Sequence, residues 1–507
     1  MKKTHRAPER RQFDETLLVT GLHPSGAGLA RSEHGSAVLV AGALPGDRVA
    51  LRWTEPAPGG RFGLADSFEI LEESAHRVDP EHPRCALAGR CGGCPLARVD
   101  YATELELKTK ALVVDTLEEA GFEAARVLRP ALGHDVAKSE GFRNKAILYP
   151  VDLTENGETH RRFGFFEARS HRVVPAEDCP QSPAWMKRTA RALAAATLAA
   201  GLELYDETSG TGVLRALLMR DGARFGTVEP SSDVRGLAVL VVTDFPPEGS
   251  AEFKRIAQTL VAALPEGVSL VAHRNARPGN ALLSFEPGAS TVLCGRGAVE
   301  ASLLGLTFEV RPETFLQVNT LQTPVLYGAA VDLLHLSPGD AVLDLYCGVG
   351  TISAVLARAV GPEGRVTGVE LVEASVEAAR ANAKRNNLAN VRFEAGPVET
   401  VLPRLALERA PTKAVLDPAY KGLADSVPAV LAKLPITDLV YVSCNPKTLV
   451  RDVKRLAAFG FELESVTPVD LFPGAFHLEA VAVLRRPGDE GASRQPEGPG
   501  LKARGEE

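Results

Sequence analysis

The segment from residue 341 to residue 397 restricts the fold of this chain more than any other. AVLDLYCGVGTIS, at 341–353, predicts an apolar strand, a glycine turn and the start of a helix over 352–360. RVTGVE, at 365–370, predicts a second strand, followed by a helix over 371–386 and a third strand in NVRFEAG. Strands that alternate with helices in this way predict a doubly wound, Rossmann-like α/β sheet.

The glycine turn also predicts a cofactor site. A turn of this kind lets a ligand approach backbone amides at the start of a helix. Glu370 ends the second strand about 20 residues after the glycines, where a carboxylate accepts both ribose hydroxyls of a nucleoside. A nicotinamide dinucleotide fits this geometry, and a turn used only for helix packing is the plainer alternative. GVG lacks the third glycine of the dinucleotide motif and follows Asp344, so S-adenosylmethionine is favoured.

The chain has 507 residues, more than one hydrophobic core accommodates, so about three domains are expected. Short β-branched segments between glycine and proline turns predict a small barrel over 15–71, with an unrelated five-stranded barrel as the alternative. The middle of the chain gives mixed helix and strand patterns. The expected division is a basic arm at 1–14, a barrel at 15–75, a central α+β domain at 76–305, the Rossmann-like domain at 306–485 and a disordered tail at 486–507.

Charge and hydropathy exclude some classes of protein. The net charge is −7, so any nucleic-acid surface must be a local patch. The basic N-terminus is followed by no signal-like apolar stretch, and no run of about 18 uncharged apolar residues occurs. We therefore expect a cytoplasmic protein that is neither exported nor inserted in a membrane.

Four cysteines form a separate pattern. Cys85, Cys91 and Cys94 lie within ten positions, and Cys179 is followed by proline. In a chain without an export signal, such clustering favours metal binding over disulfides. Four thiolates suffice for one [4Fe-4S] cluster or one structural zinc, and their spacing alone leaves both open.

Three further motifs place polar residues directly after apolar strands. They are AVLDPAYKGL at 414–423, LVYVSCNPKTL at 439–449 and VDLFPGAFHLEAVAVL at 469–484. In open α/β sheets, ligands bind at that edge.

With these motifs, the chain resembles the class I RNA uracil-5 methyltransferases, a family that includes tRNA T-loop and 23S rRNA enzymes. The resemblance covers nearly the whole chain before the tail, and SCNP followed by HLE is its most specific part. It also rests on the cysteine cluster and on four segments: residues 23–49, similar to the TRAM barrel, FRNKA at 142–146, FLQVN at 315–319 and DLYCGVGT.

The resemblance implies an OB-like TRAM barrel, a central RNA-binding domain with an iron–sulfur loop and a class I methyltransferase domain. It makes Cys444 the nucleophile and Glu479 the base. Carbon 5 of uracil is too weak a nucleophile to take a methyl group unaided, and addition of a thiolate to C6 activates it. A free thiol has a pKa near ~8.5, so we expect Cys444 to lie partly exposed in a polar or positive setting.

By the same resemblance, five residues contact or support S-adenosylmethionine: Gln317, Tyr346, Thr351, Glu370 and Asp417. The cysteine group, Cys85, Cys91, Cys94 and Cys179, is expected to hold a [4Fe-4S] cluster. Two positions depart from the family pattern: Tyr420 stands where arginine is common, and Pro397 where a polar residue is common. Cys294, Cys347 and His477 are expected to be structural.

The expected partner is RNA, with 23S rRNA ranked above the tRNA T-loop, and the expected state is a monomer. A catalytically decayed RNA-binding or chaperone protein is the first alternative, which the intact Cys444, Glu479 and Asp417 argue against. A small-molecule methyltransferase is the second. The barrel and the long middle region make it the weaker reading.

Overall fold

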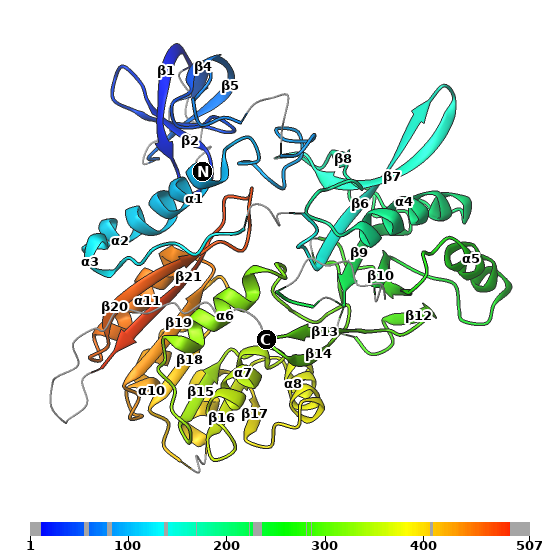
Figure 1. Cartoon of the computed structure of the whole chain (residues 1–507). Helices are drawn as coiled ribbons and strands as arrows, with labels where there is room; N and C mark the ends of the chain where they lie inside the picture. The colour runs from blue at the N-terminus through cyan, green and yellow to red at the C-terminus, as the bar shows by residue number, and fades with distance from the viewer. Residues whose placement is uncertain are drawn as a thin grey trace, which may run out of the picture.

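The computed structural model describes residues 12–54, 60–78, 84–135, 140–168, 170–222, 224–226, 236–279, 281–284, 286–405 and 409–486. Figure 1 shows three structured parts: an N-terminal barrel, a central sheet with helices, and a C-terminal sheet flanked by helices. The tail expected to be disordered lies outside the described residues from 487 onward. No described helix has the length and apolarity that crossing a membrane requires.

The N-terminal part is a closed five-stranded barrel, as predicted, in the order β1-β2-β3-β5-β4. Its strands are β1 (Gln12–Leu22), β2 (Gly28–Arg31), β3 (Ala37–Val40), β4 (Arg48–Thr54) and β5 (Gly63–Glu72). The N-terminal arm was predicted to end at residue 14, but residues 12–14 already belong to β1 and pair with β4. Trp53 fills the barrel, fully buried, and a Cβ at Gly63 would lie 2.4 Å from its ring. Only glycine fits there.

The central part is a seven-stranded sheet in the order β12-β11-β10-β9-β6-β7-β8. Its strands are β6 (Lys145–Glu155), β7 (Glu158–Phe166), β8 (Val173–Pro175), β9 (Leu214–Asp221), β10 (Gly236–Val242), β11 (Val268–Arg274) and β12 (Ser290–Cys294). Two helices, α4 (Ala184–Ala199) and α5 (Ala251–Ala262), pack against one another, and α4 also contacts β7 and β10. Trp185, Met186 and Leu193 on α4 join the apolar core of this part.

The C-terminal sheet has the order β17-β16-β15-β18-β19-β21-β20. Its strands are β15 (Ala341–Leu345), β16 (Arg365–Glu370), β17 (Val391–Ala395), β18 (Lys413–Leu416), β19 (Asp438–Ser443), β20 (Glu462–Val469) and β21 (Glu479–Arg485). The first five in space pair in parallel, and β21 pairs antiparallel with β19 and β20. The predicted doubly wound sheet is confirmed.

Helices cover both faces of this sheet (Figure 1). They are α6 (Gln322–Asp332), α7 (Thr351–Ala359), α8 (Glu373–Arg385), α9 (Val398–Val401), α10 (Val427–Leu431) and α11 (Pro446–Ala457). Neighbouring residues of one strand enter opposite cores, as Val342 and Leu343 do, because side chains alternate along a strand. A hairpin, β13 (Val299–Leu303) with β14 (Leu306–Val310), joins one of these cores.

A helical segment between the barrel and the central sheet packs on the C-terminal sheet. It comprises α1 (Tyr101–Lys108), a π-helical stretch (Thr109–Val114), α2 (Asp115–Glu119) and α3 (Ala124–Val127). Leu128 bridges to Val466 on β20, and Leu117 joins a core of the C-terminal sheet. Packing therefore places this segment with the Rossmann-like part, although its position in the sequence suggested the central one.

A buried ion network fastens that segment to the loop between β20 and β21. The ammonium group of Lys108, fully buried, contacts Glu104 at 2.8 Å and Asp470 at 3.0 Å, and donates to the carbonyl of Phe472 at 3.0 Å. Arg84 contacts the second oxygen of Glu104 at 2.6 Å. Two buried carboxylates thus share one buried ammonium group, and each carboxylate also accepts a hydrogen bond from another side chain.

Further donors complete the network on the loop side. The Tyr101 hydroxyl donates to Asp470 at 2.9 Å, and the backbone amide of Gly474 donates to Glu104 at 2.6 Å. The amide of Leu96, in the cysteine-rich segment, donates to the carbonyl of Gly474 at 2.8 Å. Three segments far apart in the chain therefore meet at one group of charges.

We expect Lys108→Met to lower the free energy of unfolding by about 3 to 5 kcal/mol, because two buried carboxylates then lose their shared cation. Lys110→Met is the matched control: Lys110 is exposed and pairs with Asp115 on the surface, so it should cost less than about 1 kcal/mol. Urea unfolding of both variants measures the difference. Equal losses in the two variants would contradict a special role for the network.

Candidate active site

The glycine turn after β15 adopts the backbone that its sequence requires. Gly348 and Gly350 have φ of 54° and 79°, and Gly350 caps α7. A Cβ at Gly350 would lie 2.9 Å from the ring of Phe393. Tyr346, with φ of 66°, is a non-glycine residue in this left-handed region and marks local strain where the strand meets the turn.

Asp344 lies under this turn, fully buried. The Ser353 hydroxyl donates to one of its oxygens, and the other oxygen has no hydrogen-bond partner within the described part of the chain. Burial raises the pKa of Asp344 to about 7. An unpaired buried carboxylate oxygen beside a ligand turn is a group that a bound donor or cation would satisfy.

Glu370 holds the two loops at this edge together. Its carboxylate accepts from the amide of Gly348 at 3.1 Å and from the amide of Val372 at 2.9 Å. Leu371 and Val372, next to it, are 64% and 41% exposed. A carboxylate with exposed apolar side chains beside it suits a ribose joined to a flat apolar base. Thr351, at the start of α7, lies 3.1 Å from the hydroxyl of buried Tyr327.

Asp417, Cys444 and Glu479 meet at the same edge of the sheet. Asp417 and Cys444 directly follow the parallel strands β18 and β19, and Glu479 begins the antiparallel strand β21. Ser443 and Ala480 are register partners, so Cys444 and Glu479 are the next residues outward on neighbouring strands. The sheet topology therefore brings together three residues that the sequence separates by up to 62 positions.

Electrostatic coupling confirms that these three groups are close. Burial, then the charges of Glu479 and Asp417, raise the pKa of the Cys444 thiol to about 12. Burial, then Glu479 and Asp344, raise the pKa of Asp417 well above its ordinary value. Cys444 is half-buried, as expected, but its neighbours are acidic instead of positive. The setting is therefore polar, one of the two settings expected, and its acidic neighbours favour the protonated thiol.

His477 lies beside Glu479, with 3.6 Å between its Nε2 and a carboxylate oxygen. Its ring packs edge-on against Phe472 at 4.6 Å between ring centres. The histidine is therefore held in place by packing, as expected, and also adjoins a carboxylate of the site.

Gln317 is buried in a loop that is fixed by two hydrogen bonds from asparagine side chains to backbone carbonyls. The side chain of Asn144 donates to the carbonyl of Gln317 at 2.6 Å, and that of Asn319 donates to the carbonyl of Leu471 at 2.9 Å. The motifs FRNKA and FLQVN thus form one contact with the loop before Glu479. Sequence reasoning placed neither asparagine in a role, although both motifs contain one.

The four cysteines of the cluster motif lie near one another. The charges of Cys179, Cys91 and Cys85, after burial, raise the pKa of Cys94 to about 12, while Arg143 acts in the opposite direction. Within the described ranges, no three histidine, cysteine, aspartate or glutamate side chains have the arrangement of a metal site. The structure therefore gathers these thiols without showing a formed centre.

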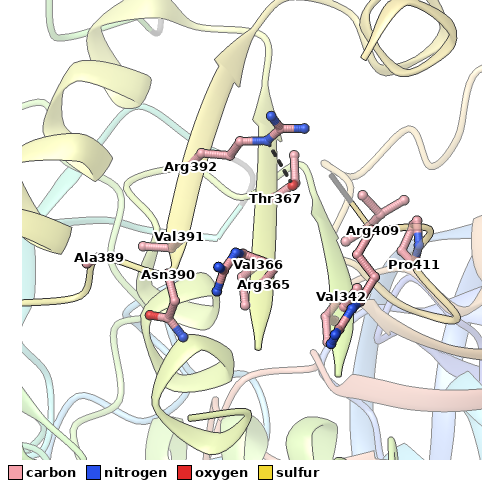
Figure 2. A pocket seen from close by; sticks show the side chains of 12 residues that line it. Val342, Arg365, Val366, Thr367, Ala389, Asn390, Val391, Arg392, Arg409 and Pro411 are labelled. Atoms are coloured by element: carbon pink, nitrogen blue, oxygen red, sulfur yellow. Dashed lines mark hydrogen bonds between the residues drawn. The ribbon is translucent and has the colours of Figure 1, made fainter. Parts of the chain in front are cut away.

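Two cavities adjoin the C-terminal sheet. Figure 2 shows the smaller, of about 100 Å³, at the amino-terminal ends of β15, β16 and β17, where Arg392 donates to Thr367 at 3.3 Å. It lies at the edge opposite Cys444 and Asp417. The larger, of about 470 Å³, follows β17 and is lined by exposed Pro397. Pro397, one of the two positions that depart from the family pattern, therefore borders this cavity at the carboxyl-terminal edge of the sheet.

Comparison with known proteins gives concordant results. Residues 336–473 match the family model described as a methyltransferase domain. An uncharacterized RNA methyltransferase of Gloeobacter violaceus is 35% identical over 93% of this chain and 96% of its own, and one of Halalkalibacterium halodurans is 31% identical over 94% and 98%. The Pyrococcus abyssi tRNA (uracil-54, C5)-methyltransferase, solved with S-adenosyl-L-homocysteine, shares the fold with a TM-score of 0.70 at 22% identity, over 92% of this chain and 99% of its own.

The full-length relatives, the methyltransferase-domain match and the residues gathered at one sheet edge agree, and the chain belongs to the RNA methyltransferase family.

Proposed function

We propose that this protein transfers a methyl group from S-adenosylmethionine to carbon 5 of a uridine in structured RNA. The observation that carries the proposal is the position of Cys444 next to Glu479 on adjoining strands, beside the glycine turn. Methylation of an exocyclic nitrogen or a ribose hydroxyl needs no thiol, whereas C5 methylation needs one to activate the ring. The shared fold with an enzyme titled as a uracil-C5 methyltransferase agrees with this proposal.

The cofactor proposal rests on charge and shape. S-adenosylmethionine carries a sulfonium cation, and Asp344 and Asp417 supply carboxyl groups around the turn whose raised pKa values a bound cation would lower. Glu370 is proposed to bind the ribose, while Gln317, Tyr346, Thr351 and Asp417 line or support the rest of the molecule. When bound, the cofactor supplies an electrophilic methyl group.

The residues of the chain then divide the remaining work. Cys444 loses its proton to a neighbouring carboxylate, and its sulfur bonds to C6 of the uracil, which places the electron pair on C5. C5 accepts the methyl group, Glu479 removes the C5 proton, and that electron pair reforms the C5–C6 double bond as the sulfur leaves. The sulfur leaves with the electron pair of the C6–S bond and then takes up a proton, which the raised pKa of the Cys444 thiol favours, so the free thiol is regenerated.

The resemblance to the RNA uracil-5 methyltransferases supports a proposal for the RNA substrate, the oligomeric state and the cellular location. We propose 23S rRNA as the substrate, with the tRNA T-loop as the alternative, and a monomer working in the cytoplasm. The barrel is proposed to be a TRAM module.

Loss of the nucleophile tests the function. In a strain that lacks this gene, the wild-type chain should restore 5-methyluridine, mapped by mass spectrometry in 23S rRNA and tRNA, whereas Cys444→Ala should restore none. Cys294→Ala, at another half-buried cysteine, is the control and should restore the modification. S-adenosylmethionine should bind Cys444→Ala within a few fold of wild type, because the thiol acts on uracil. Normal methylation by Cys444→Ala would refute the mechanism.

Glu479→Gln separates two steps of the same reaction. If Glu479 removes the C5 proton, this variant still adds Cys444 to C6 and accepts the methyl group, but cannot release the product. We expect a methylated protein–RNA adduct that survives denaturing electrophoresis. Glu464→Gln, on the neighbouring strand and paired with Arg485, should form none. An inactive Glu479→Gln without adduct would make Glu479 a binding or structural residue.

We also propose that Cys85, Cys91, Cys94 and Cys179 hold a [4Fe-4S] cluster. Three of their sulfurs already accept N–H groups: Cys85 from Leu87, Cys91 from Gly93 and Cys94 from Gln181, at 3.4, 3.4 and 3.3 Å. Hydrogen bonds of this kind accompany iron–sulfur ligands.

Anaerobically purified protein is expected to be brown and to contain about four irons per chain. Cys91→Ala should remove the iron and lower thermal stability, because metal binding contributes folding energy. Cys294→Ala, outside the group, should retain both. Elemental analysis that returns one zinc and no iron would overturn the cluster proposal.

A further inference from the structure

Tyr420 is the most exposed large aromatic side chain among the described residues, at 66%. It follows Asp417 by three positions in the segment after β18. Its backbone carbonyl accepts from the side chain of Asn445 at 3.2 Å and from the hydroxyl of Thr448 at 3.4 Å. Asn445 is the residue after Cys444, so the nucleophile and the tyrosine backbone are fixed to each other.

The segment around Tyr420 is ordered by further hydrogen bonds from α11. The guanidinium of Arg451 donates to the carbonyl of Lys421 at 2.8 Å, and the buried carboxylate of Asp452 accepts from the amide of Leu423 at 2.7 Å. A rigid backbone beneath an exposed ring means that little conformational entropy is lost when the ring binds a partner. The hydrogen bonds from Asn445, Thr448 and Arg451 reach only backbone carbonyls of this segment, so they do not account for an aromatic side chain at position 420.

Two exposed lysines flank the same position. Lys421 is the next residue, and Lys447 lies in the first turn of α11, beside Asn445. Neither ammonium group forms an ion pair with a residue that the structure describes. In a chain of net charge −7, unpaired positive charge at the entrance to an acidic site is a local patch that suits an anionic polymer.

The barrel borders the other side of this entrance. Burial, and then the positive charge of Lys447, lower the pKa of His23 in the turn between β1 and β2. In the same turn, a Cβ at Gly26 would lie 3.1 Å from Phe476. Lys447, three residues after Cys444, therefore lies near this turn of the barrel.

We propose that the ring of Tyr420 stacks on a base of the RNA beside the target uridine, while Lys421 and Lys447 contact its phosphates. The proposal deepens the function proposed above and rests on it. An aromatic face with adjacent lysines is the combination that binds single-stranded nucleic acid with little sequence preference. Tyr420 thereby acts as a positioning residue that places the target base over Cys444.

The test uses the full-length protein and a fluorescein-labelled, single-stranded RNA of mixed sequence that contains uridine. Tyr420→Ala should weaken RNA binding by on the order of ten-fold, because one stacked base is lost. Tyr420→Phe keeps the ring and should bind within about two-fold of wild type. Phe459→Ala removes another exposed aromatic, beyond the far end of α11, and should leave affinity unchanged.

Salt dependence separates stacking from charge. Lys447→Gln should make the plot of log affinity against log salt concentration shallower by about 0.7, since one phosphate contact is lost. Tyr420→Ala should keep the wild-type slope, and its thermal unfolding should match that of Phe459→Ala. An RNA with 2-aminopurine next to the uridine should show quenched fluorescence with wild type and Tyr420→Phe, but not with Tyr420→Ala.

The outcomes keep the two proposals distinct, because RNA binding is measured without methyl transfer. If wild type methylates uridine and Tyr420→Ala binds RNA normally, the stacking proposal is wrong while the proposed function stands. The exposed ring would then be a candidate contact for another protein. If wild type yields no 5-methyluridine yet Tyr420→Ala loses affinity, the function fails while the RNA contact stands. Equal losses in Tyr420→Phe and Tyr420→Ala would also overturn the stacking proposal.

Discussion

The contact of Lys108 with Glu104 and Asp470 is the constraint on which the arrangement of the other parts depends. All three side chains are fully buried, and a buried charge is tolerable only when its partners are in place. The helix that carries Lys108 and Glu104 comes from the first quarter of the chain, whereas Asp470 precedes the last strand. The two ends of the described chain are therefore held in one geometry, and the loop leading to Glu479 is set by it.

The loop between β20 and β21 brings a third side chain to the edge of the sheet where Asp417 and Cys444 lie. The parallel strands β18 and β19 place Asp417 and Cys444 at their carboxyl ends, and the antiparallel return of β21 adds Glu479 at the same level. Burial, and then the negative charges around them, raise the pKa values of Asp417 and Cys444. A cation bound beside these groups would act in the opposite direction and lower both pKa values, because it favours the ionised forms.

The sequence predicted the parts in which local pattern and fold agree. Strands of the Rossmann-like sheet and of the barrel are bounded by glycine turns, and the predicted helix starts differ from α7 and α8 by one or two residues. The central sheet could not be predicted because β9 and β10 are buried along nearly all their length, which removes the alternation that marks a strand. The helical segment at 101–127 could not be assigned to its neighbour either, since its packing depends on long-range contacts.

The site shows the same division. Motif order indicated which residues belong together, but the acidic surroundings of Cys444 arise from residues 27 positions before it and 35 after it, on separate strands. The chemistry of the thiol alone predicted a polar or positive setting and could not show that the polar neighbours are acidic. The roles of Asn144 and Asn319 could not be predicted for a similar reason. Each side chain donates to a backbone carbonyl of a distant segment, and the sequence does not show which segments meet.

The packing of the β1–β2 turn on Phe476 has a geometric consequence. A Cβ at Gly26 would lie 3.1 Å from Phe476, closer than side chains usually pack, and Phe476 is three residues from Glu479. The barrel and this edge of the C-terminal sheet therefore hold one separation, so a change in the β1–β2 turn would be transmitted to the loop that leads to Glu479.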